Sequence, residues 1–180
     1  MSYVQSEHIP SGIYIIRNYG TRNLIALRSR DKELLGSIST TDRSWKWLVT
    51  HNSNNKYTIQ SVPDGFHAQC PPTPQSGHSI VVESIHCQWE IKQVSGVAAR
   101  DCYWIYSSKN VRLVWSLPNG EDGQSVVFAV ESSNPRLWWR FERFEDAASS
   151  MEEVTGRLMN LPVHDTEVAY GSGNLNNPQA

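Results

Sequence analysis

A chain of 180 residues with 39% hydrophobic and 19% charged residues is long enough for one domain with a full apolar core. Its formal net charge of −2 gives no field that would favour nucleic acid or an anionic membrane, so neither partner is expected. The sequence has no secretory signal at its start and no stretch near the roughly twenty apolar residues of a membrane span. With an odd number of cysteines (Cys70, Cys87, Cys102), these features predict a cytoplasmic protein with reduced thiols.

Four strand-like segments follow one another from residue 12 and then recur twice. The first of each set begins on a tyrosine, at 12–18 (Tyr14), 56–62 (Tyr57) and 102–108 (Tyr103). Two segments rich in branched residues come next, at 23–29 and 32–39, at 65–71 and 78–84, and at 111–117 and 124–132. The fourth carries a tryptophan followed two places later by an apolar residue, at 46–51, 87–94 and 139–144. Self-similarity at a period of about 40–50 residues indicates a threefold internal repeat.

Twelve short strands in three units predict an all-β closed fold, the β-trefoil, with three four-stranded repeats around a pseudo-threefold axis. No repeat can bury its apolar face alone, so each must contribute large residues to a shared core. We expect Trp47, Trp89 and Trp139 to supply these equivalent core positions. A propeller is the rival at this repeat length, but three blades are too few to surround a channel.

The sequence changes character after the third repeat, so we expect a trefoil domain over residues 1–145 and an extension over 146–180. Ser150 and Glu153 have the spacing of a capping box, and apolar residues recur at helical intervals from Met151 to Leu161. One short helix is predicted there, followed by a flexible tail at 171–180. The helix could pack on the trefoil or on a second molecule, so the chain is expected to be a monomer or a weak dimer.

The loop between the second and third strands of the first repeat is the strongest candidate for function. It holds Arg28, Ser29, Arg30, Asp31 and Lys32. A long basic side chain on a convex loop suits the specificity pocket of a trypsin-like protease, where an aspartate pairs with the cation. A rigid loop that binds like substrate would inhibit such an enzyme. The alternative is a solvated charged turn.

The corresponding loop of the third repeat suggests a different partner. Trp115 with Asn119 and Asp122 has the residue types with which lectins hold a sugar, an aromatic ring for its apolar face and polar groups for its hydroxyls. The alternatives are that the tryptophan covers an end of the barrel and that the acidic loop is only a turn. A glycan is therefore the second candidate partner.

Motifs of catalysis and metal binding are missing from the sequence. There is no Gly-rich phosphate loop, no HExxH and no GxSxG. His67 and Cys70 form an HxxC, but their odd spacing on a predicted strand sends the two side chains to opposite faces, which argues against zinc. We therefore expect neither an enzyme nor a cofactor or metal.

The run of segments from 11–18 through 66–91 and 113–129 to 136–144 resembles the mushroom β-trefoil serine protease inhibitors of the cospin and cnispin type. More distantly, it resembles the mycocypins, which inhibit cysteine proteases, and the ricin-B-like mushroom lectins. The first resemblance implies a cytosolic fungal defence protein that blocks trypsin-like enzymes through the loop between its second and third strands. Arg28 or Arg30 would then enter the specificity pocket of the protease.

Two features depart from the families that the chain resembles. The ricin-type lectin pattern has glutamine two places before each repeat tryptophan, whereas these places hold Trp45, Cys87 and Leu137, which weakens the sugar-binding interpretation. The extension after residue 145 lies outside the resemblance. A serine protease is accordingly the first predicted partner and a carbohydrate the alternative.

Overall fold

The computed structural model describes residues 8–27, 32–39, 45–96 and 100–144. The helix and tail predicted for 146–180 lie outside these residues, as do Arg28, Ser29, Arg30 and Asp31 of the predicted inhibitory loop. No helix in the described ranges is long and apolar enough to cross a membrane. The described ranges contain thirteen strands and the short 3-10 helix η3 (Pro135–Leu137). The strands are β1 (Gly12–Asn18), β2 (Leu24–Leu27), β3 (Leu34–Ser37), β4 (Lys46–His51), β5 (Tyr57–Ser61), β6 (His67–Gln69), β7 (Val81–Glu83), β8 (Trp89–Gln93), β9 (Tyr103–Ser107), β10 (Leu113–Ser116), β11 (Gln124–Ser125), β12 (Val127–Val130) and β13 (Trp139–Arg143).

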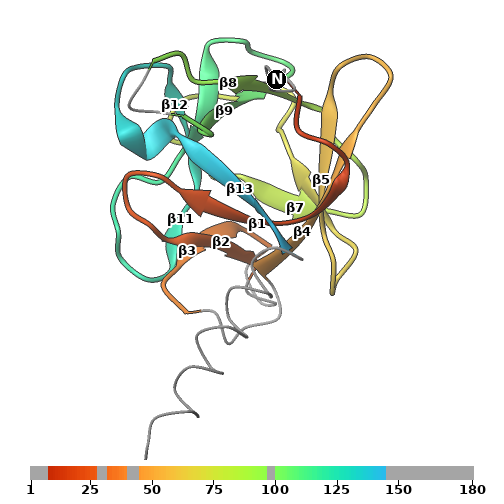
Figure 1. Cartoon of the computed structure of the whole chain (residues 1–180), viewed down its shortest axis with the longest axis horizontal. Coiled ribbons are helices and arrows are strands. Elements are labelled where there is room, and N and C mark those ends of the chain that lie inside the picture. The colour runs from red at the N-terminus through yellow and green to blue at the C-terminus, as the bar shows by residue number, and fades with distance from the viewer. Residues whose placement is uncertain (1–7, 28–31, 40–44, 97–99, 145–180) are drawn as a thin grey trace, which may run out of the picture.

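Six of these strands form a closed barrel around one axis (Figure 1). The first and last strands of each repeat pair in the order β1, β4, β5, β8, β9, β13, and β13 returns to β1. The closing pair is antiparallel, with Tyr14 opposite Arg143 and Asn18 opposite Trp139. Closure leaves no free edge in the barrel, which removes the usual site of strand-to-strand aggregation.

Three hairpins cover one end of the barrel: β2 with β3, β6 with β7, and β10 with β12. They meet in a closed ring of backbone hydrogen bonds made by Leu34, Ile80 and Val126. The Leu34 N–H donates to the Ile80 carbonyl at 2.9 Å, Ile80 to Val126 at 2.8 Å, and Val126 to Leu34 at 2.7 Å. One equivalent residue from each repeat, joined cyclically, defines a pseudo-threefold axis. The predicted β-trefoil is confirmed.

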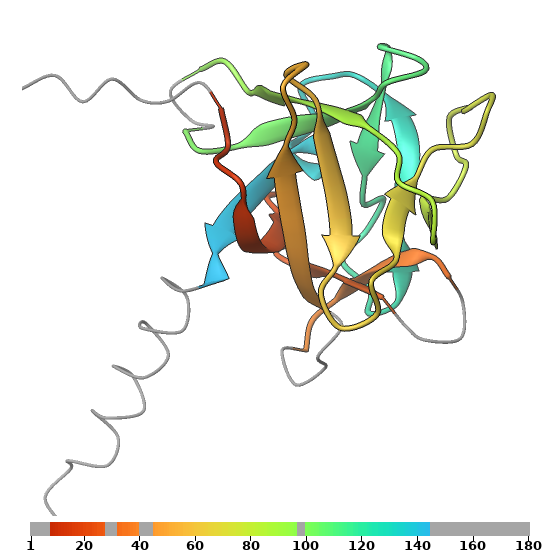
Figure 2. The same cartoon turned by 90° about the vertical axis from the view of Figure 1, so that its right-hand side faces the viewer.

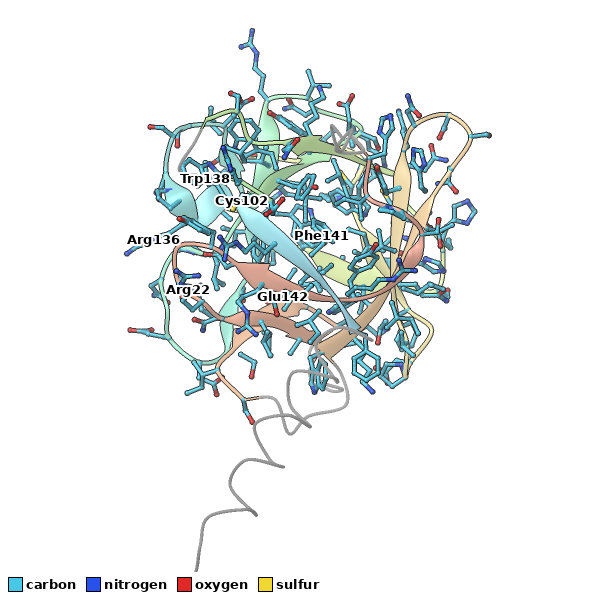
Figure 3. The ribbon with its side chains drawn as sticks, in the orientation of Figure 1. Arg22, Cys102, Arg136, Trp138, Phe141 and Glu142 are labelled. Atoms are coloured by element: carbon cyan, nitrogen blue, oxygen red, sulfur yellow. The ribbon has the colours of Figure 1, made fainter. Side chains whose placement is uncertain are left out.

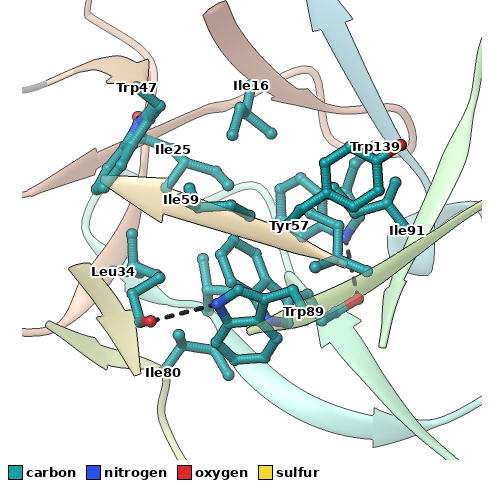
Figure 4. Close-up of a cluster of buried hydrophobic side chains, with 14 of the residues drawn as sticks. Ile16, Ile25, Leu34, Trp47, Tyr57, Ile59, Ile80, Trp89, Ile91 and Trp139 are labelled. Carbon is teal, nitrogen blue, oxygen red and sulfur yellow. Dashed lines mark hydrogen bonds between the residues drawn. The ribbon is translucent and has the colours of Figure 1, made fainter. Parts of the chain in front are cut away.

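The three repeat tryptophans occupy equivalent core positions, as predicted. Trp47, Trp89 and Trp139 are fully buried. Each indole N–H donates to a backbone carbonyl of its own repeat, at Ile25 (3.0 Å), Ala68 (3.2 Å) and Trp115 (3.1 Å), in that order. Figure 4 shows the indoles around Ile59. Large apolar area and a satisfied polar group explain why this residue type recurs at that strand position.

The third strand of the third repeat differs from the prediction of one strand over 124–132. It is divided into β11, which pairs with β3, and β12, which pairs with β10. Val126 lies between them and donates its N–H to Leu34 in the ring instead of to a ladder. The sequence pattern could not reveal this break, because a valine suits a ladder and a bridging position equally.

Candidate functional site

The predicted inhibitory loop is described only at its C-terminal side. Lys32 is exposed, with a left-handed φ of 50°, and its carbonyl accepts a hydrogen bond from the Val82 N–H at 2.7 Å. Glu33 accepts a hydrogen bond from the Ser125 hydroxyl at 2.8 Å. On the other side, Leu27 is paired with Leu34 across the hairpin. The loop that carries Arg28 and Arg30 therefore starts and ends on fixed backbone.

The sugar site predicted at Trp115, Asn119 and Asp122 is wrong in its central feature. Trp115 is fully buried in the core, so its ring cannot stack on a sugar. Every residue of β10 is buried because both faces of this short strand are covered. The Asn119 side chain accepts a hydrogen bond from Glu121 N–H at 3.1 Å, and that of Asp122 from Ile38 N–H at 3.2 Å. Asn119 thus shapes its own turn, and Asp122 ties the third-repeat loop to the end of β3.

At the barrel end opposite the hairpins, the N-terminal segment contacts two of the three repeat tyrosines. The Tyr14 hydroxyl donates to the Pro10 carbonyl at 2.8 Å, and the Tyr57 hydroxyl accepts from the Ile9 N–H at 3.2 Å. Ile9 is only 4% exposed and belongs to the main apolar core, so this segment acts as a plug. Figure 2 shows it (red) close to the start of β9 (green).

The third repeat tyrosine, Tyr103, borders a pocket that the plug leaves open. In the part of the chain that the structure describes, its hydroxyl makes no hydrogen bond. We call this hollow of about 300 Å³ the tyrosine pocket; it is lined by His8, Ile9, Pro10, Tyr14, Asp101, Tyr103 and Phe141. The Phe141 ring meets Tyr103 edge to face, with centroids 5.7 Å apart and planes at 87°.

Polar groups in the tyrosine pocket are held in fixed positions. Asp101 has a left-handed φ of 63° in the turn two residues before β9 begins. Burial raises the pKa of Tyr103, and the negative charge of Asp101 raises it further. Tyr103 therefore stays a neutral hydroxyl that can donate, next to a carboxylate that can only accept.

The groups that line the tyrosine pocket can bind a ligand. The pocket is lined by aromatic edges, the hydroxyls of Tyr14 and Tyr103, one carboxylate and one imidazole, and its lining contains no serine or cysteine. Nor do three His, Cys, Asp or Glu side chains gather to hold a metal ion anywhere in the described ranges. A ligand with an apolar face and several hydroxyls would match these groups.

The cysteines lie elsewhere and are buried free thiols. The Cys70 sulfur is 3.0 Å from the Ser107 hydroxyl. Its hydrogen bond to Cys87 raises the pKa of Cys70 and lowers that of Cys87. His67 instead lies beside His86, at 6.1 Å between ring centroids. His67 and Cys70 thus have different partners, as the odd spacing of the HxxC predicted.

No protein-family model and no curated protein matches the sequence. Solved structures are similar in fold. A ricin B-like lectin of Macrolepiota procera, in complex with lactose, matches with a TM-score of 0.69 at 18% identity, covering 77% of this chain and 99% of the lectin. The Rhizoctonia solani agglutinin matches at 0.66 and 20% identity, over 76% of this chain and 97% of its own.

A third solved structure of similar fold is also a fungal lectin. The Polyporus squamosus lectin, bound to the epitope Neu5Acα2-6Galβ1-4GlcNAc, has a TM-score of 0.63 and 20% identity, over 76% of this chain and 50% of the lectin. The chain shares the β-trefoil fold with fungal lectins. At these identities the likeness concerns the fold, which hosts many activities, so function rests on the site.

The sequence prediction missed the tyrosine pocket. Tyr14, Tyr57 and Tyr103 occupy the same place in the repeat pattern, and nothing in that pattern distinguishes the third. The difference arises from residues 8–10, which precede the first repeat and cover Tyr14 and Tyr57. The one local signal was Asp101, a turn residue immediately before a strand.

Proposed function

We propose that the chain binds a carbohydrate in the tyrosine pocket. The observation that carries the proposal is the asymmetry of the tyrosine end. Two of three equivalent hydroxyls bind the plug, and the third, on Tyr103, faces a hollow beside Asp101. A sugar hydroxyl both donates and accepts, so it can bridge a tyrosine hydroxyl and a carboxylate, while its C–H face packs on Phe141.

The size of the pocket and the known neighbours support the same partner. At about 300 Å³ the hollow is at the lower end of small-molecule sites. That volume favours one or two sugar rings over a longer chain. The Macrolepiota procera lectin of the same fold binds lactose. A galactose-terminated disaccharide is therefore the first probe to use.

Two substitutions test the pocket directly. We expect Tyr103→Phe and Asp101→Asn each to weaken binding of the best oligosaccharide about tenfold, because a hydrogen bond contributes about 0.5–1.5 kcal/mol, and one to a charged group about 1.5–3 kcal/mol. A glycan array, with lactose among its probes, selects that oligosaccharide, and isothermal titration calorimetry measures its affinity. Tyr103→Phe leaves the packing against Phe141 intact, so loss of affinity reports on the hydroxyl.

Asn119→Ala is the matched control, since Asn119 lies in the turn that was first predicted to bind sugar and not in the tyrosine pocket. The Asn119→Ala variant should bind the oligosaccharide as tightly as the parent chain does. If both pocket variants keep full affinity, the sugar binds at another part of the surface and not in the tyrosine pocket. Retention of no glycan at all would reject carbohydrate binding.

Inhibition of a trypsin-like protease is the second candidate function. It is favoured by the fixed ends of the loop over 28–31, because anchoring by Leu27–Leu34 pairing and by the Glu33–Ser125 hydrogen bond limits the entropy lost on docking. Lys32 also borders a hollow of about 370 Å³ with Phe66 and Glu83, which offers further contact area.

Titration of trypsin with the parent chain, Arg28→Ala and Arg30→Ala tests this second candidate. We expect inhibition by the parent chain and a loss of at least about 100-fold in one variant, because the basic residue in the specificity pocket dominates such binding. Arg112→Ala, on the turn before β10, should inhibit like the parent chain. Undiminished trypsin activity at micromolar protein would remove this candidate.

A further inference from the structure

Two arginines lie against the ring of Tyr19, a residue of the turn after β1 that does not line the tyrosine pocket. The guanidinium carbon of Arg22 is 5.2 Å from the centroid of the Tyr19 ring, and that of Arg140 is 4.9 Å away. The Trp138 ring lies 5.7 Å from Tyr19. We call these four residues the arginine–tyrosine cluster. Figure 3 shows Arg22 and Trp138 on the same side of the molecule, with Cys102 beside Trp138.

Positive charge in this cluster is not balanced by carboxylates. Arg17 lies directly across from Arg140 in the β1–β13 ladder, and like charges in such positions repel. Glu142 pairs with Arg17, with its Oε1 2.8 Å from the Arg17 Nε. Within the described ranges neither Arg22 nor Arg140 makes an ion pair, and the buried Nε of Arg140 has no hydrogen-bond partner.

Another acid, Asp101, lines the tyrosine pocket. Asp101 and Arg140 both act on the thiol of Cys102, which packs in a small apolar cluster with Tyr19 and Trp138. Burial raises the pKa of Cys102, and the hydrogen bond to Arg140 offsets part of this shift, so the thiol stays neutral. It adds no negative charge to the cluster. In the described residues, two guanidiniums near one ring are thus without a paired carboxylate, on a chain with net negative charge.

The loops that carry the cluster are rigidly joined. The Tyr19 N–H donates to the Trp138 carbonyl at 2.8 Å, and the Gly20 N–H to the Pro135 carbonyl at 3.1 Å. A Cβ at Gly20 would lie 2.9 Å from backbone atoms of Pro135 and Arg136, so only glycine allows this approach. The backbone that carries Tyr19 and Trp138 is therefore fixed before any ligand arrives, which lowers the entropy lost on binding.

We propose that the arginine–tyrosine cluster binds the anionic group, a carboxylate or a sulfate, of an acidic oligosaccharide. This inference rests on the proposed carbohydrate binding and names its class of glycan. Arginine recognises planar carboxylates and sulfates through paired N–H donors, and Tyr19 and Trp138 add apolar surface for a sugar ring. Two arginines confined to one patch match a single anionic group better than a nucleic acid, which needs an extended basic stripe.

Three oligosaccharide probes distinguish the sources of the anion. Isothermal titration calorimetry would compare neutral lactose with sialyllactose, which carries a carboxylate, and with 6-sulfo-lactose, which carries a sulfate. We expect the parent chain to bind at least one acidic probe about tenfold more tightly than lactose at low salt. Preference for one acidic probe over the other identifies the anionic group.

Arg22→Gln and Arg140→Gln should each reduce this preference to below about threefold and leave the affinity for lactose unchanged. Arg112→Gln, which removes an exposed arginine outside the cluster, should keep the preference. Equal melting temperatures of the variants exclude a folding defect, and the indole N–H resonance of Trp138 should shift with the acidic probes only.

The possible outcomes separate the two proposals. Equal affinity for neutral and acidic probes would overturn this inference and leave the tyrosine pocket standing. A preference that Arg112→Gln reduces as much as Arg22→Gln would overturn it too, because attraction would then be a general charge effect. Binding of acidic probes alone, lost in the arginine variants, would support the cluster and overturn the pocket. Binding of no probe would overturn both.

Discussion

Replacing Trp89 by alanine is expected to lower the free energy of unfolding by about 3–5 kcal/mol, as for other buried aromatic residues cut to a methyl group. Trp89 is fully buried, its ring packs edge to face on Trp115 at 4.9 Å, and it stacks near Phe128 at 6.2 Å. Its removal also leaves the Ala68 carbonyl without the indole donor. Cavity, lost ring contacts and an orphaned acceptor all act in the same direction.

Urea denaturation followed by circular dichroism measures the loss. Trp47→Ala and Trp139→Ala should lose similar amounts, because the three indoles occupy equivalent positions with equivalent hydrogen bonds. Trp45→Ala is the matched control, since that half-buried ring packs on Phe144 and Lys46 at the surface and should lose far less. A Trp89 variant no less stable than the Trp45 variant would contradict the shared-core account of the fold.

Replacing Asn18 by alanine is expected to lower the free energy of unfolding by about 2–3 kcal/mol, because buried polar partners would lose their bonds. Asn18 is fully buried at the end of β1. Its amide group donates to the Arg136 carbonyl at 2.8 Å, and its oxygen accepts from the N–H groups of Gly20 at 3.1 Å and Thr21 at 3.0 Å. One side chain thus joins the β1–β2 turn to η3.

The same substitution is expected to loosen the arginine–tyrosine cluster, because Tyr19 and Trp138 lie on the two segments that Asn18 joins. Affinity for acidic oligosaccharides should fall with stability, while affinity for neutral ones should not. Asn23→Ala is the matched control: it is equally buried but makes one side-chain hydrogen bond, to the Gly120 carbonyl at 3.2 Å. Equal stability of the two variants would show that Asn18 is not the main link between the β1–β2 turn and η3.

The barrel could be predicted from the sequence because its determinants repeat. The same tryptophan pattern occurs at Trp47, Trp89 and Trp139. If one copy were assigned wrongly, comparison with the other two would reveal it. The tyrosine-led strands could be predicted for the same reason, and their positions required no knowledge of distant partners. Repetition is therefore the physical reason why the fold could be predicted from the sequence.

The sites were not accessible because they depend on departures from the repeat. Trp115 looked like a surface aromatic, yet both faces of β10 are covered. Tyr103 differs from Tyr14 and Tyr57 only through a plug that precedes the repeats. Arg22 and Arg140 come together through the closing pair of strands, which joins the two ends of the domain. None of these contacts has a local signature.

The ring of hydrogen bonds made by Leu34, Ile80 and Val126 has a consequence for how the chain reaches its native state. Every bond in it joins residues in different repeats, so the ring cannot form until all three hairpins are present. Contacts between such distant residues slow the search for the native topology, typically to milliseconds or seconds. A nascent chain that lacks its last hairpin would expose unpaired amide groups at this apex, and a chaperone would be expected to recognise the unfinished end.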